Sequence, residues 1–256
     1  MKRRGEVVVR KLTAATAVMV VLMLGSAQAQ EWTGDGFLSI NGGGQIGDRQ
    51  FEANLSVPKF DEIAEFETDH DLGGGGILNV VGVLRVWRSL GVGAGFSLQE
   101  STDDISGSGT VPNPLFFDRP RPVSFTETGL KHREIGIHLS AVYVIPVSER
   151  FRVSLFGGPT LFRVRQDLVS DITLGPETDA PLFETVSVAS VATSSVNGTG
   201  GGGHVGFDGA FLLNEQLGFG GFFRFAGGSV DLPTGNSMTS VGVGGAQLGG
   251  GLRVSF

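Results

Sequence analysis

Apolar and polar residues alternate with a period of two in eight segments of about ten residues, which are spread from Phe37 to the end of the chain. This alternation is typical of β-strands, because successive side chains of a strand point to opposite faces. One face of each segment carries mainly aliphatic residues and Phe, and the other carries polar residues and Gly. The pattern predicts eight strands, at residues 37–44, 77–87, 90–99, 133–145, 151–164, 203–212, 217–226 and 246–256.

The connections between the predicted strands alternate in length. Three connections are short, at residues 88–89, 146–150 and 214–216. The others are polar and mostly long, at residues 45–72, 100–131, 166–199 and 231–240. Short turns at one end and long loops at the other, with an even number of strands, are typical of bacterial outer-membrane barrels. We therefore predict an all-β fold, an eight-stranded antiparallel up-and-down transmembrane β-barrel.

A ten-stranded barrel is the main alternative, because residues 186–196 are also rich in β-branched side chains. We interpret this stretch as part of a hairpin that extends beyond the membrane. Within the fifth predicted strand, Gly157, Gly158 and Pro159 indicate a bulge or a bend, since Gly and Pro weaken a strand interior.

Alternation alone does not show which face lies inside, because a soluble lipocalin-like barrel places apolar residues inward and charges outward. Here the apolar face carries no charge across the middle of any segment, as contact with lipid requires. The opposite face has too few charges for a solvated surface. Large aromatic residues near the short turns fit a girdle at one membrane interface, and they are Trp87, Tyr143, Phe151 and Phe219. We therefore predict that the apolar face contacts lipid.

The polar face carries a small set of charges of both signs, which the prediction places in a narrow lumen. The members of this lumen charge network are Arg85, Glu134, His138, Arg152, Asp208, Arg224 and Arg253. A lone ion in a low-dielectric interior costs several kcal/mol, so these groups are expected to pair. In the structural interpretation they form a salt-bridged plug, because an eight-stranded interior is just wide enough for side chains. In the functional alternative they gate a small anion path.

Residues 1–29 have the three parts of a secretory signal peptide. Basic residues come first, an apolar stretch follows at residues 12–24, and Ala27-Gln28-Ala29 forms an A-x-A cleavage site. An uncleaved anchor is the alternative, but the apolar stretch is short for one. We expect cleavage after Ala29, which leaves a single barrel domain at residues 30–256.

Composition removes several classes of protein. The chain has no Cys, which excludes disulfide scaffolds, thiol catalysis and Cys-based metal centres. Residues 1–29 hold five cations and one carboxylate, so without them the formal charge changes from −7 to −11, and nucleic acid is a poor partner. The 42 Gly residues show no collagen period. Many lie on the predicted lumen face, where they leave room for Arg side chains and Phe222; these are Gly91, Gly93, Gly95, Gly218, Gly220, Gly249 and Gly251.

The last residues carry a family resemblance. Phe256 is terminal, and Val254 and Leu252 stand two and four positions before it. This ending resembles the C-terminal insertion signal of outer-membrane β-barrels, which implies recognition by the barrel assembly machinery. The chain as a whole resembles the small OmpA/OmpX-type and opacity-type barrels, but it ends on the last predicted strand, without a peptidoglycan-binding domain. The resemblance implies a monomer in the outer membrane of a diderm bacterium, in contact with outer-membrane lipid.

One pair of residues has the spacing of a catalytic couple. His138 and Ser140 lie two apart on one strand face, as in outer-membrane lipid A deacylases, in which a His and a Ser hydrolyse an acyl ester. Those enzymes act on the lipid-facing side, whereas this pair is predicted to face the lumen, and Ser140 is followed by Ala141 rather than by the family's Asn. We interpret the pair as polar lumen residues near Glu134.

The predicted loop at 45–72 holds a second candidate, Asp69-His70-Asp71, with three possible cation ligands. Adjacent residues on a mobile loop rarely converge on one ion, so we interpret this acidic stretch as solvated surface. The Gly runs 73–76 and 200–203 lack the residues of a phosphate-binding loop. We therefore predict no catalytic, cofactor-binding or metal-binding residues. The expected function is a non-enzymatic surface role, with long loops available to an extracellular ligand. A narrow pore or small-molecule channel is the alternative, and a lipid A-modifying hydrolase is a second one.

Overall fold

The computed structural model describes residues 32, 34–47, 49–234 and 237–256. The expected signal peptide, with Ala27 and Ala29, lies outside the described residues. Ten antiparallel strands account for most of the described chain. They are β1 Gly36–Ile46, β2 Arg49–Lys59, β3 Glu62–Leu72, β4 Gly75–Trp87, β5 Leu90–Val111, β6 Arg121–Pro146, β7 Phe151–Leu174, β8 Val188–Leu212, β9 Leu217–Thr234 and β10 Ser237–Ser255.

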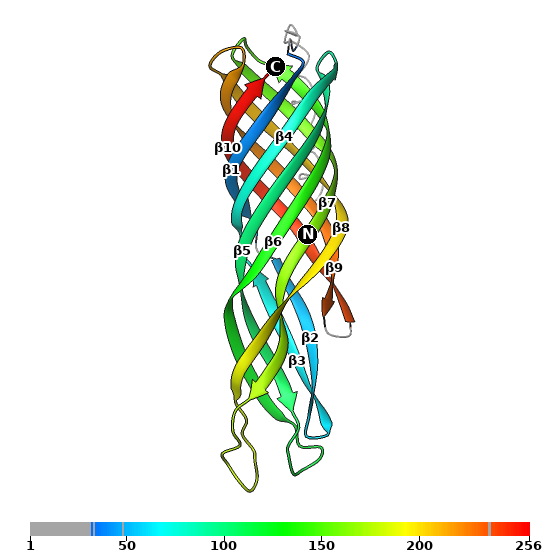
Figure 1. Ribbon diagram of the computed structural model, residues 1–256, viewed down its shortest axis with the longest axis vertical. Helices are drawn as coiled ribbons and strands as arrows, with labels where there is room; N and C mark the ends of the chain where they lie inside the picture. The colour runs from blue at the N-terminus through cyan, green and yellow to red at the C-terminus, as the bar shows by residue number, and fades with distance from the viewer. Residues whose placement is uncertain (1–31, 33, 48, 235–236) are drawn as a thin grey trace, which may run out of the picture.

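Eight of the ten strands close into a ring. β1 pairs with both β10 and β4, the ring continues from β4 to β5, and β5 pairs with β6. In the sequence β2 and β3 come between β1 and β4, and they pair with each other as a hairpin. This hairpin continues the sheet beyond the ends of β1 and β4, where β3 pairs with β5 (Figure 1). The prediction of an eight-stranded antiparallel barrel is confirmed. The ten-stranded alternative has the right number of strands, but two of them stay outside the ring.

The long connections were wrongly predicted as loops, because most of their residues belong to strands. The β5–β6 ladder runs out to Val111↔Arg121, and the β7–β8 ladder runs out to Leu174↔Val188. Residues 186–196 therefore fall largely in a hairpin beyond the membrane, as expected. We call the part of the sheet beyond the membrane the extension (Figure 1). Its ladders end in a turn at residues 60–61 and in loops at residues 112–120 and 175–187, which together form the tip.

The extension has an apolar core of its own, which loops would lack. One cluster next to the membrane segment comprises Phe51, Ala53, Leu72, Phe162, Val164, Leu168, Ala226, Val230, Leu232, Val241 and Val243. A second cluster nearer the tip comprises Ala64, Phe66, Val111, Val123 and Ile172. Full burial of a Val, Leu, Ile or Phe side chain stabilises the folded state by about 1.5–3 kcal/mol. The extension is thus a folded stalk that continues the membrane barrel.

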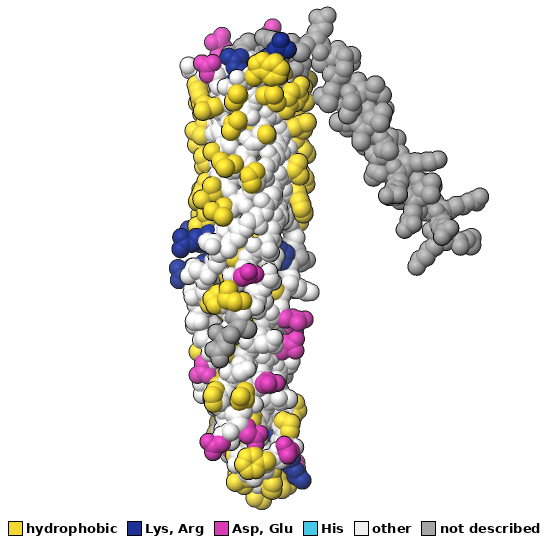
Figure 2. Space-filling model, turned by 90° about the vertical axis from the view of Figure 1, so that its right-hand side faces the viewer, with side chains coloured by type: hydrophobic (Ala, Val, Ile, Leu, Met, Phe, Trp, Pro, Cys, Tyr) yellow, Lys and Arg dark blue, Asp and Glu magenta, His cyan; other side chains and the backbone are white. Residues whose placement is uncertain are grey.

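The outer surface of the membrane segment is apolar, as the lipid-facing prediction requires. Its belt is yellow in Figure 2 and covers the half of the molecule that has the short turns. Exposed Leu, Ile, Val and Phe side chains alternate with buried polar ones along the strands. The expected aromatic girdle is present at the short-turn end, where Trp87, Tyr143, Phe151 and Phe219 are exposed. No helix in the described part of the chain is long and apolar enough to cross a membrane.

Two glycine interpretations had different outcomes. An added Cβ at Gly249 would lie 2.8 Å from a ring carbon of Phe222, and one at Gly220 would lie 3.2 Å from Nε of Arg253. The small residues therefore do make room inside the barrel. Gly157-Gly158-Pro159 predicted a bulge or a bend. No bulge is present, because the β6–β7 register passes from His138↔Thr160 to Ala141↔Gly157 without a shift. Pro159 lacks an N–H, which explains a local break in pairing without an extra residue.

Candidate functional site

The lumen of the membrane segment contains a buried ion pair between β10 and β8. Arg253 is completely buried, and its Nη2 donates a short hydrogen bond to Asp208 Oδ2, while its Nε donates to Oδ1 over 3.2 Å. Arg253 Nη1 also donates to Asn41 Oδ1 on β1 over 2.6 Å. Arg152 lies beside this pair, where it donates to Ser255 Oγ and stacks on the ring of Phe37. These side chains fill the lumen at the short-turn end of the barrel.

Arg224 is held by amides instead of a carboxylate. Its Nε donates to Gln247 Oε1 over 2.7 Å, Gln247 Nε2 donates to Gln45 Oε1 over 2.6 Å, and Gln45 Nε2 donates to the main-chain oxygen of Gly244. This chain of bonds joins β9, β10 and β1. Neither Gln was predicted as a member of the lumen network, although both occupy inward positions of the alternation.

A row of imidazoles and hydroxyls crosses the middle of the lumen. His138 lies 2.8 Å from Ser97 Oγ and 2.9 Å from Thr160 Oγ1, and Thr160 lies 2.8 Å from Nδ1 of His204. His204 Nε2 is 2.9 Å from Ser140 Oγ. Ser140 thus contacts His204, not the expected partner His138. Neither imidazole contacts a carboxylate in the described part of the chain, and both rings are closed off from lipid by the sheet.

Glu134 belongs to a separate layer at the distal end of the membrane segment, so the expected proximity to His138 and Ser140 does not hold. Its Oε1 accepts hydrogen bonds from Arg49 and His132, and its Oε2 accepts one from the N–H of Gly244 over 3.1 Å. On the other side of its ring, His132 contacts Gln166, whose amide donates to Asp103 over 2.6 Å.

Arg85 lies outside the lumen network, contrary to the expectation. It stands at the rim beside the short turn 88–89, where Nη1 donates to the main-chain oxygen of Trp32 over 2.6 Å and Nη2 pairs with Asp35 over 3.3 Å. Both side chains of this ion pair are partly or fully open to solvent.

Little space remains between these layers. The cavity lined by Asn41, His138, Ser140, His204 and Arg224 measures about 30 Å³. That is room for one or two water molecules. An apolar cluster of Trp32, Phe37, Val83, Val142 and Val144 fills the short-turn end below it. The geometry therefore fits a plug and leaves no room for a fatty acyl chain beside Ser140.

Asp69, His70 and Asp71 do not converge, because they lie on strand β3 and alternate between its faces. His70 is buried, and it stacks on Phe51 with ring centroids 4.3 Å apart, while both Asp side chains are exposed. Burial lowers the pKa of His70 to about 4, against the opposing effect of the Asp69 charge. No cluster of His, Asp and Glu that could hold a metal ion occurs among the described residues.

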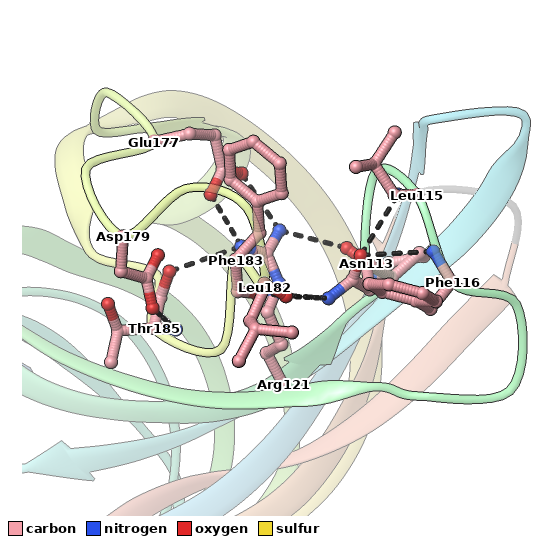
Figure 3. Close-up of polar contacts among 10 residues, drawn as sticks. Asn113, Leu115, Phe116, Arg121, Glu177, Asp179, Leu182, Phe183 and Thr185 are labelled. Carbon is pink, nitrogen blue, oxygen red and sulfur yellow. Dashed lines mark hydrogen bonds and ion pairs between the residues drawn. The ribbon is translucent and has the colours of Figure 1, made fainter.

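The tip is a second candidate site, which was not predicted from the sequence. Arg121, at the start of β6, forms a two-pronged ion pair with Glu177, with contacts of 2.6 and 2.9 Å (Figure 3). The same guanidinium donates to the main-chain oxygens of Pro112 and Thr185. Arg121 is almost fully buried by these contacts. One side chain thus ties loop 112–120 to loop 175–187.

Asn113 makes the second link between the two loops (Figure 3). Its Nδ2 donates to the main-chain oxygens of Leu182 and Phe183 at 3.1 and 3.0 Å, and its Oδ1 accepts from the N–H groups of Leu115 and Phe116. Asn113 therefore binds backbone groups of both loops, its own and loop 175–187. The loops have a defined conformation although neither contains regular secondary structure.

These bonds hold large apolar side chains in solvent. Phe117 is 77% exposed and Leu115 is 61% exposed. Exposed apolar residues from loop 175–187, from the turn at 60–61 and from the adjoining start of β3 add to the surface. The set is Phe60, Ile63, Leu115, Phe116, Phe117 and Leu182. We call this set the apolar tip, and Figure 2 shows hydrophobic side chains gathered there.

The three C-terminal residues that resemble an insertion signal lie at the short-turn end. The side chains of Leu252 and Phe256 are exposed on the lipid-facing surface, with Val254 partly exposed between them. The main-chain oxygen of Phe256 accepts hydrogen bonds from the N–H groups of Asp35 and Gly36, so the chain end seals against β1.

No protein-family model and no curated protein matches the sequence. Several solved outer-membrane proteins are similar in structure. OprG from Pseudomonas aeruginosa has a TM-score of 0.49 at 13% identity, with 87% of this chain and 97% of that one covered. The protease OmpT from Escherichia coli has a TM-score of 0.46 at 8% identity (90% and 100% covered). Neisserial surface protein A has a TM-score of 0.41 at 14% identity (86% and 97% covered). With its closed ring, apolar belt and unequal ends, this chain has the architecture of a small outer-membrane β-barrel.

Proposed function

We propose that this outer-membrane barrel is a non-enzymatic surface protein that presents the apolar tip to a partner outside the cell. The observation that carries the proposal is the contrast within the tip. Buried bonds of Arg121 and Asn113 fix the loops, yet Leu115 and Phe117 remain in water. Burying such side chains is favourable, and contiguous exposed apolar surface marks interaction sites.

The interior supports a structural role for the membrane segment. The ion pair Arg253–Asp208 and the amides around Arg224 occupy the lumen, and the central cavity is only about 30 Å³. The imidazoles of His138 and His204 contact hydroxyl groups, whereas a nucleophile-base couple is usually oriented by a third, acidic group. We propose that the barrel is a monomeric, non-conducting anchor, exported with cleavage of the signal peptide and inserted by the barrel assembly machinery.

Cell attachment tests the role of the tip. Cells that lack the protein are supplied with wild type, with Leu115→Ser/Phe117→Ser, or with the matched control Val147→Ser, which removes an exposed apolar side chain at the other end of the barrel. Heat-modifiable gel migration checks that all three are folded in the membrane. We expect the tip variant to reduce retention on epithelial monolayers at least fivefold, because apolar anchors dominate interface energies, and the control to match wild type. Equal retention of the tip variant and wild type would contradict the proposal.

Mass spectrometry of lipid A tests the absence of hydrolase activity. We expect identical acylation in cells with no protein, with wild type and with Ser140→Ala. Loss of an acyl chain only in wild-type cells would show that the barrel is an enzyme.

A further inference from the structure

Four exposed cations lie together where the apolar belt ends on the side of the extension. They are Lys131 and Arg133 on β6 and Arg163 and Arg165 on β7, and we call them the basic patch. Arg133 stands directly opposite Arg165 in the β6–β7 ladder, and Arg163 stands opposite Ile135. In Figure 2 dark blue side chains mark this limit of the belt.

The patch is not explained by the protein's own ion pairs. Arg133 contacts Glu100 over 3.1 Å, and both side chains are about half exposed or more. Within the described part of the chain, no ion pair involves Lys131, Arg163 or Arg165. Like charges directly opposite in a ladder are destabilising. The fold therefore tolerates a repulsion between Arg133 and Arg165 that an external anion would relieve.

The surroundings of the patch suit an amphiphile better than a free anion. Directly towards the membrane, the outward positions of the same strands hold Ile135, Ile137 and Leu161, which contact acyl chains in the predicted orientation. On the other side lies an open hollow of about 760 Å³. Three cations, two carboxylates and hydroxyl groups line it, among them Lys131, Arg133, Arg165, Glu100, Asp167, Thr102 and Ser195. Glu100 pairs with Arg133, and Asp167 accepts a hydrogen bond from Ser195, so both carboxylates already have partners. Apolar contacts below, cations at the interface and hydroxyl groups above match a lipid with a phosphorylated sugar headgroup.

We propose that the basic patch binds the phosphate groups of a phosphorylated glycolipid of the outer leaflet. The guanidinium groups of Arg133, Arg163 and Arg165 donate to the phosphate oxygens, which they can contact with two parallel hydrogen bonds each. Lys131 adds a point charge. Residues 122–130 of β6 separate the basic patch from the tip. The proposed lipid site is therefore independent of the role proposed for the tip.

A titration with lipid A tests the site. Refolded protein in zwitterionic phosphocholine micelles receives diphosphoryl lipid A, and backbone amide shifts in β6 and β7 give the dissociation constant. Wild type is compared with Arg163→Gln/Arg165→Gln and with the control Arg88→Gln/Arg150→Gln, which removes two exposed cations at the short-turn end. Each cation near an anionic surface contributes roughly a factor of five. We therefore expect binding about 25-fold weaker in the patch variant, unchanged binding in the control, and largely retained binding in Arg163→Lys/Arg165→Lys.

Two further measurements are needed. The first distinguishes a lipid phosphate from free phosphate, and the second tests whether the patch variant loses binding only because it is less stable. Inorganic phosphate at the same phosphate concentration should produce no comparable shift, and dephosphorylated lipid A should bind much more weakly. Without lipid A, Arg163→Gln/Arg165→Gln should unfold at the wild-type temperature or above, because it removes repulsion. Equal affinity of wild type and the patch variant would overturn the proposal, and so would equal binding of dephosphorylated lipid or of inorganic phosphate.

Discussion

Arg121 Nη1 and Nη2 contact Glu177 Oε2 and Oε1 at 2.6 and 2.9 Å, so a parallel pair of charge-assisted hydrogen bonds joins two loops at the outermost end of the protein. The Arg121 side chain is 3% exposed and that of Glu177 is 22% exposed. A pair this well shielded from water fixes geometry as well as contributing energy. It is the main bond on which the conformation of the tip depends.

Arg121→Gln should loosen the tip without unfolding the barrel. The variant loses the ion pair and the hydrogen bonds to Pro112 and Thr185, so the open form of the loops becomes more populated. Cleavage of a locally opened segment follows its population. We expect chymotrypsin to cut loops 112–120 and 175–187 at least tenfold faster than in wild type. Glu184→Gln is the control, since Glu184 is exposed and forms no ion pair within the described residues; faster cleavage there too would contradict the assignment to Arg121.

Asp208→Ala should destabilise the membrane segment strongly, because it leaves Arg253 buried without its counter-charge. Breaking a buried pair from one side costs about 3–5 kcal/mol. Urea unfolding of the refolded barrel in micelles measures the loss. Replacing both partners, as Asp208→Leu/Arg253→Met, should recover much of it. If both variants were as stable as wild type, the pair would not be a structural plug.

The extension should lose stability as pH falls from about 6.5 towards 4, because of His70. Burial lowers its pKa to about 4 in the folded protein, whereas the unfolded value is near 6.5. The unfolded chain therefore binds more protons within this window, and stability rises with pH there. The full effect is about 3 kcal/mol, present above pH 6.5 and lost by pH 4. Proteolytic opening of the extension against pH measures it, and His70→Gln should flatten the curve. A wild-type curve that is already flat would contradict the burial of a neutral His70.

Amide hydrogen exchange separates a folded stalk from mobile loops. The ladder positions between Ile105↔Glu127 and Val111↔Arg121 should be protected, since they are hydrogen-bonded around an apolar core. The exposed residues Glu149 and Arg150 of the short turn serve as the unprotected reference, because the N–H groups of Val147 and Ser148 are bonded to the main-chain oxygen of Phe151. Exchange in residues 105–111 as fast as in that turn would show that the extension is not folded.

The membrane strands could be predicted because lipid imposes a strict pattern. Each lipid-facing position must be apolar, so segments such as 90–99 show their alternation plainly. The extension faces water, so the outward positions of its strands carry charged residues. In β3 these are Glu65, Glu67 and Asp69. Ala64 and Phe66 alternate with them and face the core. The period of two is present there as well, but the charges made it look like a loop.

Partners inside the lumen depend on how the ring closes. Gln45 and Gln247 meet because β1 pairs with β10, and that register cannot be derived from either segment alone. Arg85 was misplaced for a related reason: it has the inward phase of the alternation but lies at the strand end, where β4 and β5 shift register between Arg85 and Trp87. The position of Arg121 at the tip also required the long β5–β6 ladder, which the sequence did not reveal.

Single-channel recording in planar bilayers tests the central claim, that the membrane segment is a closed anchor for the folded extension. With Arg224 and Arg253 filling the lumen and a cavity of about 30 Å³, pure refolded protein should show no steady conductance steps. Arg224→Ala should lower the temperature of heat-modified gel migration and still not conduct. Steady single-channel steps from wild type, altered in size by Arg224→Ala, would contradict the account and establish a pore.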